Sequence, residues 1–249
     1  MDANSIKPQA HWVEVSGREH ARLATEEVGS GPAFVWGHSL LGSMAQDRAG
    51  GVLAWRELAD VARVIRFDAR GHGQSESCGA PEDFRWDELA RSMWQVADSY
   101  TDEGVVLGGA SMGCATALHA ACQRPEQVRA LVLVTPPTAW QWRENRRRGY
   151  RVTANVVKFT HGLPLRLLGL LRIKRSANFQ KNMLSILAGH LAGAKTEGVV
   201  GALRGASLSD FPPREELARL AMPVLILAWP DDATHPLAVA EELQNTLPN

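Results

Sequence analysis

Gly109-Ala110-Ser111-Met112-Gly113 follows the apolar run Val105 to Leu107 and begins a stretch of helical character. A serine at a sharp turn between a strand and a helix is held in a strained backbone conformation, and small neighbours let the chain turn without clashes. Its hydroxyl then stands exposed above the N-terminus of the helix. The pattern G-x-S-x-G in this setting predicts that Ser111 is a nucleophile.

Apolar runs and helical stretches alternate on both sides of this turn. Strands are predicted at residues 11–16, 22–28, 33–36, 61–67, 104–109, 128–134 and 222–228, and helices at 52–60, 86–100, 112–124, 213–220 and 236–247. Alternation at this spacing is typical of βαβ units. The fold class is therefore expected to be α/β, with a mostly parallel central sheet flanked by helices.

The alternation stops between about residue 138 and residue 208, where the sequence is helical in character. An inserted helical cap, or lid, is the simplest interpretation. We expect residues 1–137 to form the N-terminal part of the core, residues 138–212 the cap, and residues 213–249 the C-terminal part of the core.

Composition excludes several classes of function. Lys plus Arg and Asp plus Glu are equal at 27 each among 249 residues, so net charge suggests no general affinity for nucleic acid. Three cysteines make no disulfide framework, and no apolar run reaches the roughly 18 residues of a membrane span. The polar N-terminus has no signal-peptide pattern, and we expect a cytoplasmic protein.

A serine nucleophile in acyl transfer needs a base, a group that orients the base, and donors for the oxyanion. The backbone NH groups of Met112 and of Leu40, in the loop after the strand 33–36, are the expected oxyanion-hole donors. Asp232 follows the strand 222–228 and is the expected acid, because the carboxyl ends of parallel strands meet at one edge of a sheet. Asp231 is the competing choice.

Four segments together resemble the α/β-hydrolase fold family, in its esterase and lactonase-like branch. They are Gly37-His38-Ser39, the loop from Asp68 to Ser75, Gly109 to Gly113, and Asp232 to Pro236. The resemblance covers nearly the whole chain and implies a serine hydrolase that needs no cofactor and no metal. In the family the acid usually stands a few residues before a proline such as Pro236, which favours Asp232. The family's Asp68-to-Ser75 segment is a structural loop, so His72 is interpreted as structural.

The chain departs from the family in its base, which the resemblance places on a loop after one more strand. After Asp232 the only histidine is His235, in the same turn as the acid, and we expect it to be unable to reach Ser111 while Asp232 orients it. The strand 222–228 is also apolar on both faces although it would be the sheet edge. We therefore hypothesise that a last strand and the catalytic histidine are missing from this chain and lie past Asn249.

Two functions from different classes follow. The first is a serine hydrolase that acts on a carboxylic ester or lactone through an acyl-enzyme on Ser111. The alternative is a catalytically impaired or non-catalytic ligand-binding protein on a hydrolase scaffold, because no well-placed histidine is expected. A lyase or perhydrolase with the same triad is a third interpretation.

The cap contains a basic segment whose role the sequence leaves open. Ten basic residues lie between Arg143 and Arg175, against one acid, Glu144. They are Arg143, Arg146, Arg147, Arg148, Arg151, Lys158, Arg166, Arg172, Lys174 and Arg175. A solvated helix face, attraction of an anionic substrate, and docking of the amphipathic stretch 163–173 at an anionic membrane surface are the three interpretations.

An apolar pocket for a small-molecule ester or lactone is expected beside the serine. Candidates for its lining are His38, Trp140 and Trp229, and packing in the core is the alternative for each tryptophan. The cap histidines His161 and His190 are further candidates for a group that reaches the site.

Overall fold

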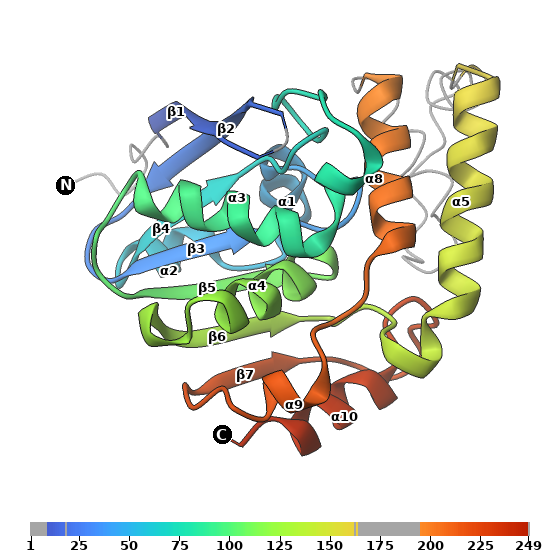
Figure 1. Ribbon diagram of the computed structural model, residues 1–249. Coiled ribbons are helices and arrows are strands. Elements are labelled where there is room, and N and C mark those ends of the chain that lie inside the picture. The colour runs from blue at the N-terminus through green and yellow to red at the C-terminus, as the bar shows by residue number, and fades with distance from the viewer. Residues whose placement is uncertain (1–8, 18, 162, 164–194, 249) are drawn as a thin grey trace.

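The computed structural model describes residues 9–17, 19–161, 163 and 195–248, and its strands form one seven-stranded sheet (Figure 1). The strands are β1 (Gln9–Val15), β2 (Ala21–Val28), β3 (Ala33–Gly37), β4 (Arg63–Phe67), β5 (Val105–Ala110), β6 (Val128–Val134) and β7 (Val224–Leu227). Their order in the sheet is β1-β2-β4-β3-β5-β6-β7. β1 pairs antiparallel with β2, and β2 pairs antiparallel with β4. All other neighbouring strands pair parallel, which confirms the predicted mostly parallel sheet.

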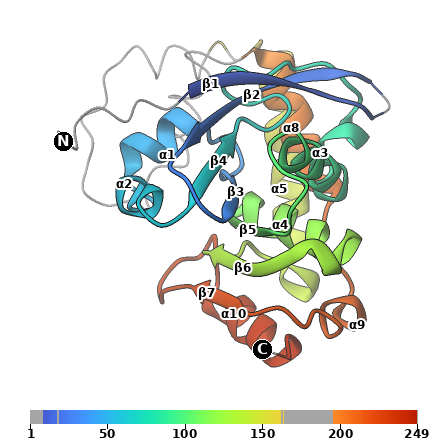
Figure 2. The ribbon, with the colours of Figure 1, turned by 90° about the vertical axis from the view of Figure 1, so that its left-hand side faces the viewer.

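Helices cover both faces of the sheet (Figure 2). They are α1 (Met44–Gly50), α2 (Trp55–Ala59), α3 (Trp86–Asp98), α4 (Met112–Gln123), α5 (Glu144–Phe159), α8 (Thr196–Leu208), α9 (Arg214–Leu217) and α10 (Leu237–Thr246), with 3-10 turns η1 (Pro81–Phe84), η2 (Pro125–Gln127) and η3 (Trp140–Trp142). Side chains alternate along β3, so that Val35 packs in one cluster with α3 and α4, while Phe34 and Trp36 pack with Trp55 of α2 on the opposite face.

The segment between β3 and β4 differs from the predicted helix at 52–60. It contains two short helices, of which α1 was not predicted. Ser43 caps α1, because its Oγ accepts a hydrogen bond from the backbone NH of Gln46, and Gly51 ends it in a left-handed conformation with φ of 62°. A helix of 7 residues is too short for its apolar periodicity to be visible in the sequence.

α5 and α8 form a helical pair beside the sheet, where Figure 1 shows them side by side. Ala154 and Val157 of α5 pack against Val199 and Leu203 of α8, and Phe84 of η1 joins the same buried cluster. This confirms the helical character expected between residues 138 and 208 for the described part. Residues 164–194 lie outside the described residues, and with them His190, most of the stretch 163–173, and four of the basic residues.

β7 is the edge of the described sheet and pairs with β6 on one side. Its burial alternates, since Leu225 and Leu227 are 52% and 40% exposed while Val224 and Ile226 pack on the core. The edge position and the apolar character of this strand were both predicted. The expectation that a further strand follows in the intact protein stays a prediction.

Candidate active site

Ser111 lies at the turn from β5 into α4 with φ of 51° and ψ of −109°, a conformation that an L-amino acid adopts only under strain. The glycines of the pentapeptide are required by close backbone approach. A Cβ on Gly113 would lie 2.0 Å from the carbonyl oxygen of Gly37 in β3, and one on Gly109 would lie 2.3 Å from the carbonyl carbon of Gly113. The pattern G-x-S-x-G thus reflects how tightly β3, β5 and α4 meet beneath the serine.

His235 contacts both Ser111 and Asp232, and the prediction that it is unable to do so is wrong. Its Nε2 lies 2.9 Å from the Oγ of Ser111, and its Nδ1 lies 2.7 Å from the Oδ2 of Asp232. The two nitrogens stand on opposite sides of the imidazole ring, so one ring bridges the serine and the carboxylate. The absence of a well-placed histidine was the reason for placing the base past Asn249 and for the non-catalytic alternative. The position of His235 removes that reason.

The loop that carries the acid explains how a residue three positions away reaches both partners. Asp231 has a φ of 65°, which turns the chain sharply before the acid. Oδ1 of Asp232 accepts hydrogen bonds from the backbone NH groups of Thr234 at 2.8 Å and His235 at 3.2 Å. This Asx turn leaves Oδ2 for the imidazole, and α10 begins directly after Pro236.

The contact between His235 and Asp232 is well shielded from solvent, since their side chains are 14% and 12% exposed. Burial lowers the pKa of His235, and the hydrogen bond and charge of Asp232 oppose that shift without cancelling it. Burial raises the pKa of Asp232, but the hydrogen bond and charge of the His235 imidazole, together with hydrogen bonds from the backbone NH groups of Thr234 and His235, outweigh it and the pKa is lowered. At neutral pH this favours a neutral imidazole beside an ionised carboxylate.

The two backbone NH groups expected to bind an oxyanion belong to structurally constrained residues. Met112 is the first residue of α4, so its NH has no acceptor within the helix. Leu40 lies in a tight turn in which the NH of Gly42 donates to the carbonyl oxygen of Ser39 at 2.7 Å, and Leu41 has a φ of 59°. Their role as oxyanion donors stays a prediction.

His38 lies beneath this turn and is 1% exposed, so the structure does not support a place in the pocket lining. Its Nε2 accepts a hydrogen bond from the backbone NH of Ala69 at 2.9 Å, and its Nδ1 lies 2.7 Å from the carbonyl oxygen of Ser39. The ring therefore carries its proton on Nδ1 and ties the turn to the loop after β4. The ring of His72 packs against it at an interplanar angle of 57°, with ring centroids 4.9 Å apart, and is buried, as its structural interpretation requires.

The two tryptophans differ in their surroundings. Trp140 packs edge-to-face on Phe211 at 5.4 Å, its Nε1 donates to the carbonyl oxygen of Pro212, and Arg214 stacks on its ring at 4.2 Å. These contacts agree with a packing role. Trp229 is 49% exposed beside the acid loop, and its place in the pocket stays a prediction.

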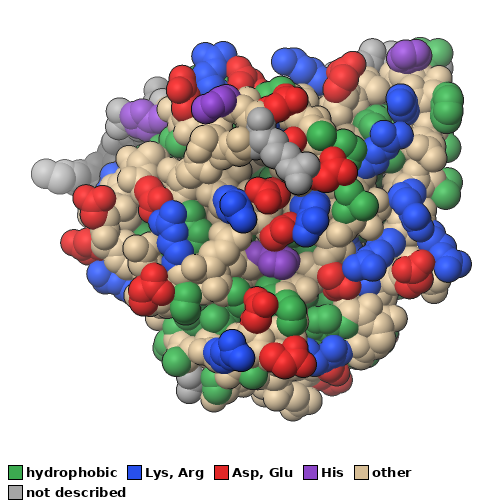
Figure 3. All heavy atoms as spheres, viewed as in Figure 1, with side chains coloured by type: hydrophobic (Ala, Val, Ile, Leu, Met, Phe, Trp, Pro, Cys, Tyr) green, Lys and Arg blue, Asp and Glu red, His purple; other side chains and the backbone are tan. Residues whose placement is uncertain are grey.

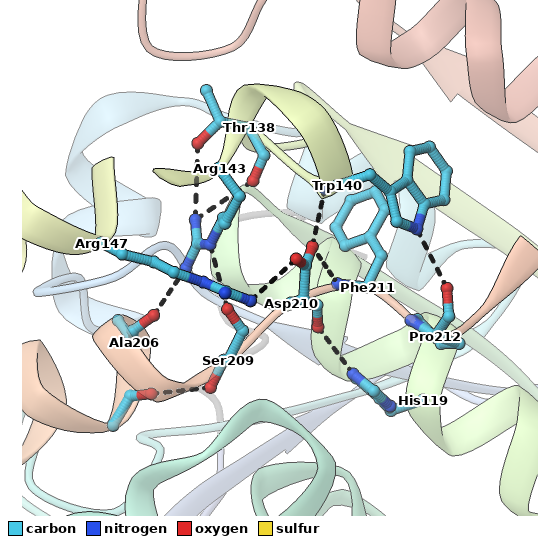
Figure 4. Close-up of polar contacts among 11 residues, drawn as sticks. His119, Thr138, Trp140, Arg143, Arg147, Ala206, Ser209, Asp210, Phe211 and Pro212 are labelled. Atoms are coloured by element: carbon cyan, nitrogen blue, oxygen red, sulfur yellow. Dashed lines mark hydrogen bonds and ion pairs between the residues drawn. The ribbon is translucent and has the colours of Figure 1, made fainter. Parts of the chain in front are cut away.

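The basic segment divides into residues with different surroundings. Arg143 is fully buried, stacks 4.0 Å above the ring of Trp86, and donates to the carbonyl oxygens of Thr138, Ala206 and Ser209 (Figure 4). Arg147 donates to Oδ2 of Asp210 at 2.9 Å in the same network. A single solvated helix face is therefore the wrong interpretation for these two residues, a distinction that helical periodicity alone does not make.

His119 joins α4 to the same network, because its Nε2 donates to the carbonyl oxygen of Asp210 at 2.9 Å (Figure 4). The carboxylate of Asp210 accepts from the backbone NH groups of Trp140 and Phe211. The start of α5 and the end of α8 are thereby fixed to one another and to the core.

The outer face of α5 carries basic and apolar side chains together at the margin of the molecule (Figure 3). Arg148 and Arg151 are exposed there, and Val156 and Phe159 are 50% and 81% exposed. Among the described helices none has the length and apolar character that crossing a bilayer requires.

Comparison with known proteins agrees with the fold. The chain is 28% identical over 244 residues to a pimeloyl-[acyl-carrier protein] methyl ester esterase of Nitrosomonas europaea, covering 92% of this chain and 88% of that protein. It is 25% identical over 241 residues to 3-oxoadipate enol-lactonase 1 of Acinetobacter baylyi, covering 95% and 85%.

A solved structure of a thermophilic esterase from Thermogutta terrifontis shares the fold with a TM-score of 0.75 at 22% identity, covering 96% of this chain and 87% of that one. The sequence model of the alpha/beta hydrolase fold matches residues 32–249. The chain belongs to the α/β-hydrolase fold family.

Proposed function

We propose that the chain is a serine hydrolase of carboxylic esters or lactones, in which Ser111 is the nucleophile, His235 the base and Asp232 the acid that orients it. The observation that supports this most directly is the pair of contacts made by one imidazole, 2.9 Å to the serine Oγ and 2.7 Å to the carboxylate. A nucleophile hydrogen-bonded to a base that a third group orients is the arrangement that acyl transfer needs.

In the first half-reaction the Oγ of Ser111 attacks the carbonyl carbon and its proton passes to Nε2 of His235. The NH groups of Met112 and Leu40 donate to the oxyanion that forms. When the tetrahedral intermediate collapses, the imidazolium gives its proton to the leaving alkoxide, and the acyl group stays on the serine. Asp232 keeps the other imidazole proton on Nδ1 and stabilises the transient positive charge.

In the second half-reaction water takes the place of the alcohol. His235 removes a proton from the water, the resulting hydroxide attacks the acyl carbon, and the proton returns to the Oγ of Ser111 as the acid leaves. For a lactone the leaving alkoxide and the acyl group belong to one molecule, and the product is a hydroxy acid. The names of the two relatives, one an ester esterase and one an enol-lactonase, support carbonyl substrates of these two kinds.

We further propose that residues 138–212 serve as a cap over the serine and supply walls of the substrate pocket. The described helical pair α5–α8 and its anchored ends support this division of the chain. No cofactor or metal takes part in the proposed steps.

The assignment is tested with p-nitrophenyl acetate and a panel of single variants. Ser111→Ala and His235→Gln should each lower kcat by about a thousandfold or more, because the nucleophile and its base act as a unit. Asp232→Asn should lower kcat by a comparable factor, since an amide favours the wrong imidazole tautomer. Burst kinetics and mass spectrometry of the trapped acyl-enzyme report the covalent step.

The matched control is His20→Gln, which replaces an exposed histidine directly before β2 and should keep the wild-type rate. Equal rates for the wild type and Ser111→Ala would refute the hydrolase proposal. A wild-type rate in His235→Gln, with loss of activity in Ser111→Ala, would show that another group is the base.

A further inference from the structure

A cap residue reaches the loop that carries the acid and the base. Nη2 of Arg146, in the first turns of α5, donates to the backbone carbonyl oxygen of Ala233 at 3.1 Å. Ala233 stands between Asp232 and His235, in the Asx turn that sets the direction of both side chains. The contact joins residues 87 positions apart in the sequence.

The backbone on both sides of Arg146 is held in place by hydrogen bonds. Arg143, directly before α5, and Arg147, in its first turn, flank Arg146, and both are fixed in the network at the base of the helical pair (Figure 4). The backbone NH of Arg147 also donates to the carbonyl oxygen of Arg143, which closes the first turn of the helix. Because the backbone on both sides of Arg146 is anchored to the core, its side chain extends from a fixed position on α5 to the loop that carries Asp232 and His235.

The guanidinium of Arg146 also acts on His235 through its charge. Burial lowers the pKa of His235, the hydrogen bond and charge of Asp232 raise it, and the positive charge of Arg146 lowers it again. Among the described residues these are the two charged groups that act on the imidazole. Arg146 thus favours the neutral form, which is the form that accepts the proton of Ser111.

We propose that Arg146 is a positioning residue of the active site, through which the cap holds the loop of Asp232 and His235 in place. This proposal rests on the proposed function of His235 as the base. Its basis is the hydrogen bond from α5 to the middle of the loop, together with the anchored start of that helix.

The test compares Arg146→Gln, Arg146→Lys and Arg151→Gln with the wild type. Arg151 is an exposed residue of the same helix, so its variant removes the same charge without touching the loop. Arg146→Gln should lower kcat by about tenfold to a hundredfold, because a small misplacement of catalytic groups has effects of this size. It should also move the acidic limb of the kcat/KM profile to higher pH.

Arg146→Lys, which keeps the positive charge, should return the acidic limb to its wild-type position. Arg151→Gln should leave the rate and the profile unchanged. Equal profiles for wild type and Arg146→Gln would overturn the proposal, and so would an equal shift in Arg151→Gln, which would indicate a general charge effect.

A second measurement separates this proposal from the assignment of the base. The imidazole of His235 is titrated by NMR in the wild type and in Arg146→Gln, which requires no turnover. We expect a higher pKa in the variant, and an unchanged pKa would overturn the proposed influence of Arg146. If the NMR shift occurs but His235→Gln keeps its esterase rate, the function of His235 as the base fails while the contact from the cap stands.

Discussion

Asp47 in α1 is a carboxylic acid buried against the sheet, with 6% of its surface exposed. Burial raises its pKa to about 6, although a 2.9 Å hydrogen bond from the indole of Trp36 and the charge of Arg66 both oppose the change. Because the folded pKa lies above the ordinary value of 3.8, folding takes up a proton between these two pH values. The contribution of this group to stability is therefore lost as the pH rises to about 6.

Asp47→Asn should remove the free-energy cost of ionising a buried carboxyl group. The amide oxygen still accepts the hydrogen bond from Trp36 and carries no charge. Relative to the wild type, the free energy of unfolding of the variant should rise between about pH 4 and about pH 7.5 by up to about 3 kcal/mol. Urea unfolding at the two pH values measures it. Asp102→Asn, an exposed aspartate, is the control and should show no such change; an equal difference at both pH values for Asp47→Asn would contradict the prediction.

At the same scale, Ser111 and Asp232 were singled out from the sequence, whereas the contacts that His235 makes with both of them were not. The pattern around Ser111 is local, because small residues are required wherever a strand and a helix turn this sharply. His235 was rejected on sequence separation, which ignores that the Asx turn at Asp232 leaves Oδ2 free for the imidazole. The spacing Asp-x-x-His directly before a helix was the available signal.

At the scale of elements, the contact between β3, β5 and α4 sets the position of Ser111 above the sheet edge. Gly113 brings the first turn of α4 against β3, where a Cβ would lie 2.0 Å from the oxygen and 2.6 Å from the carbon of the Gly37 carbonyl. Backbone atoms cannot move aside as a flexible side chain can. Any larger residue must therefore push the helix away from the sheet.

Gly113→Ala should lower the free energy of unfolding by about 3 kcal/mol or more, at the upper end of what overpacking costs. Gly149→Ala is the matched control, because a Cβ at this position of α5 meets nothing within 4 Å. Alanine is a better helix former than glycine, so this variant should be more stable than the wild type by up to about 1 kcal/mol. Chemical denaturation of both variants checks the pair. If Gly113→Ala unfolds with the wild-type midpoint, the close approach has no energetic consequence.

At the scale of the whole molecule, a few buried polar contacts join the helical pair to the sheet domain. The chain passes from the sheet domain to the helical pair near Thr138 and returns near Ser209. Arg143 bridges these two crossings, because its guanidinium donates to the carbonyl oxygens of Thr138 at the first and of Ala206 and Ser209 at the second. Burial lowers the pKa of its guanidinium to about 10, and the charges of Tyr150 and Asp210 oppose the shift. The group stays charged at neutral pH.

Arg143→Met should destabilise the protein by about 2 to 4 kcal/mol. Three buried carbonyl groups lose their donor, and this loss exceeds the gain from no longer burying a charged guanidinium. Hydrogen exchange in residues 138–143 and 205–212 should accelerate with it. Arg148→Met replaces an exposed arginine of the same helix and should stay within about 0.5 kcal/mol of the wild type. A stable Arg143→Met protein with unchanged exchange would show that apolar packing alone holds the helical pair.

The sequence by itself determined where the strands of a mostly parallel sheet lie along the chain, the strained turn at Ser111 and the carboxylate after β7. All three follow from patterns that act over a few residues: apolar runs, small residues at a turn, and a polar residue where a strand ends. Only the tertiary structure decided the contacts of His235 and the different surroundings of Arg143, Arg146 and Arg147 within one basic run. Those depend on which backbone groups of distant segments come within about 3 Å, and hydrogen bonds of that range leave no periodic trace in the sequence.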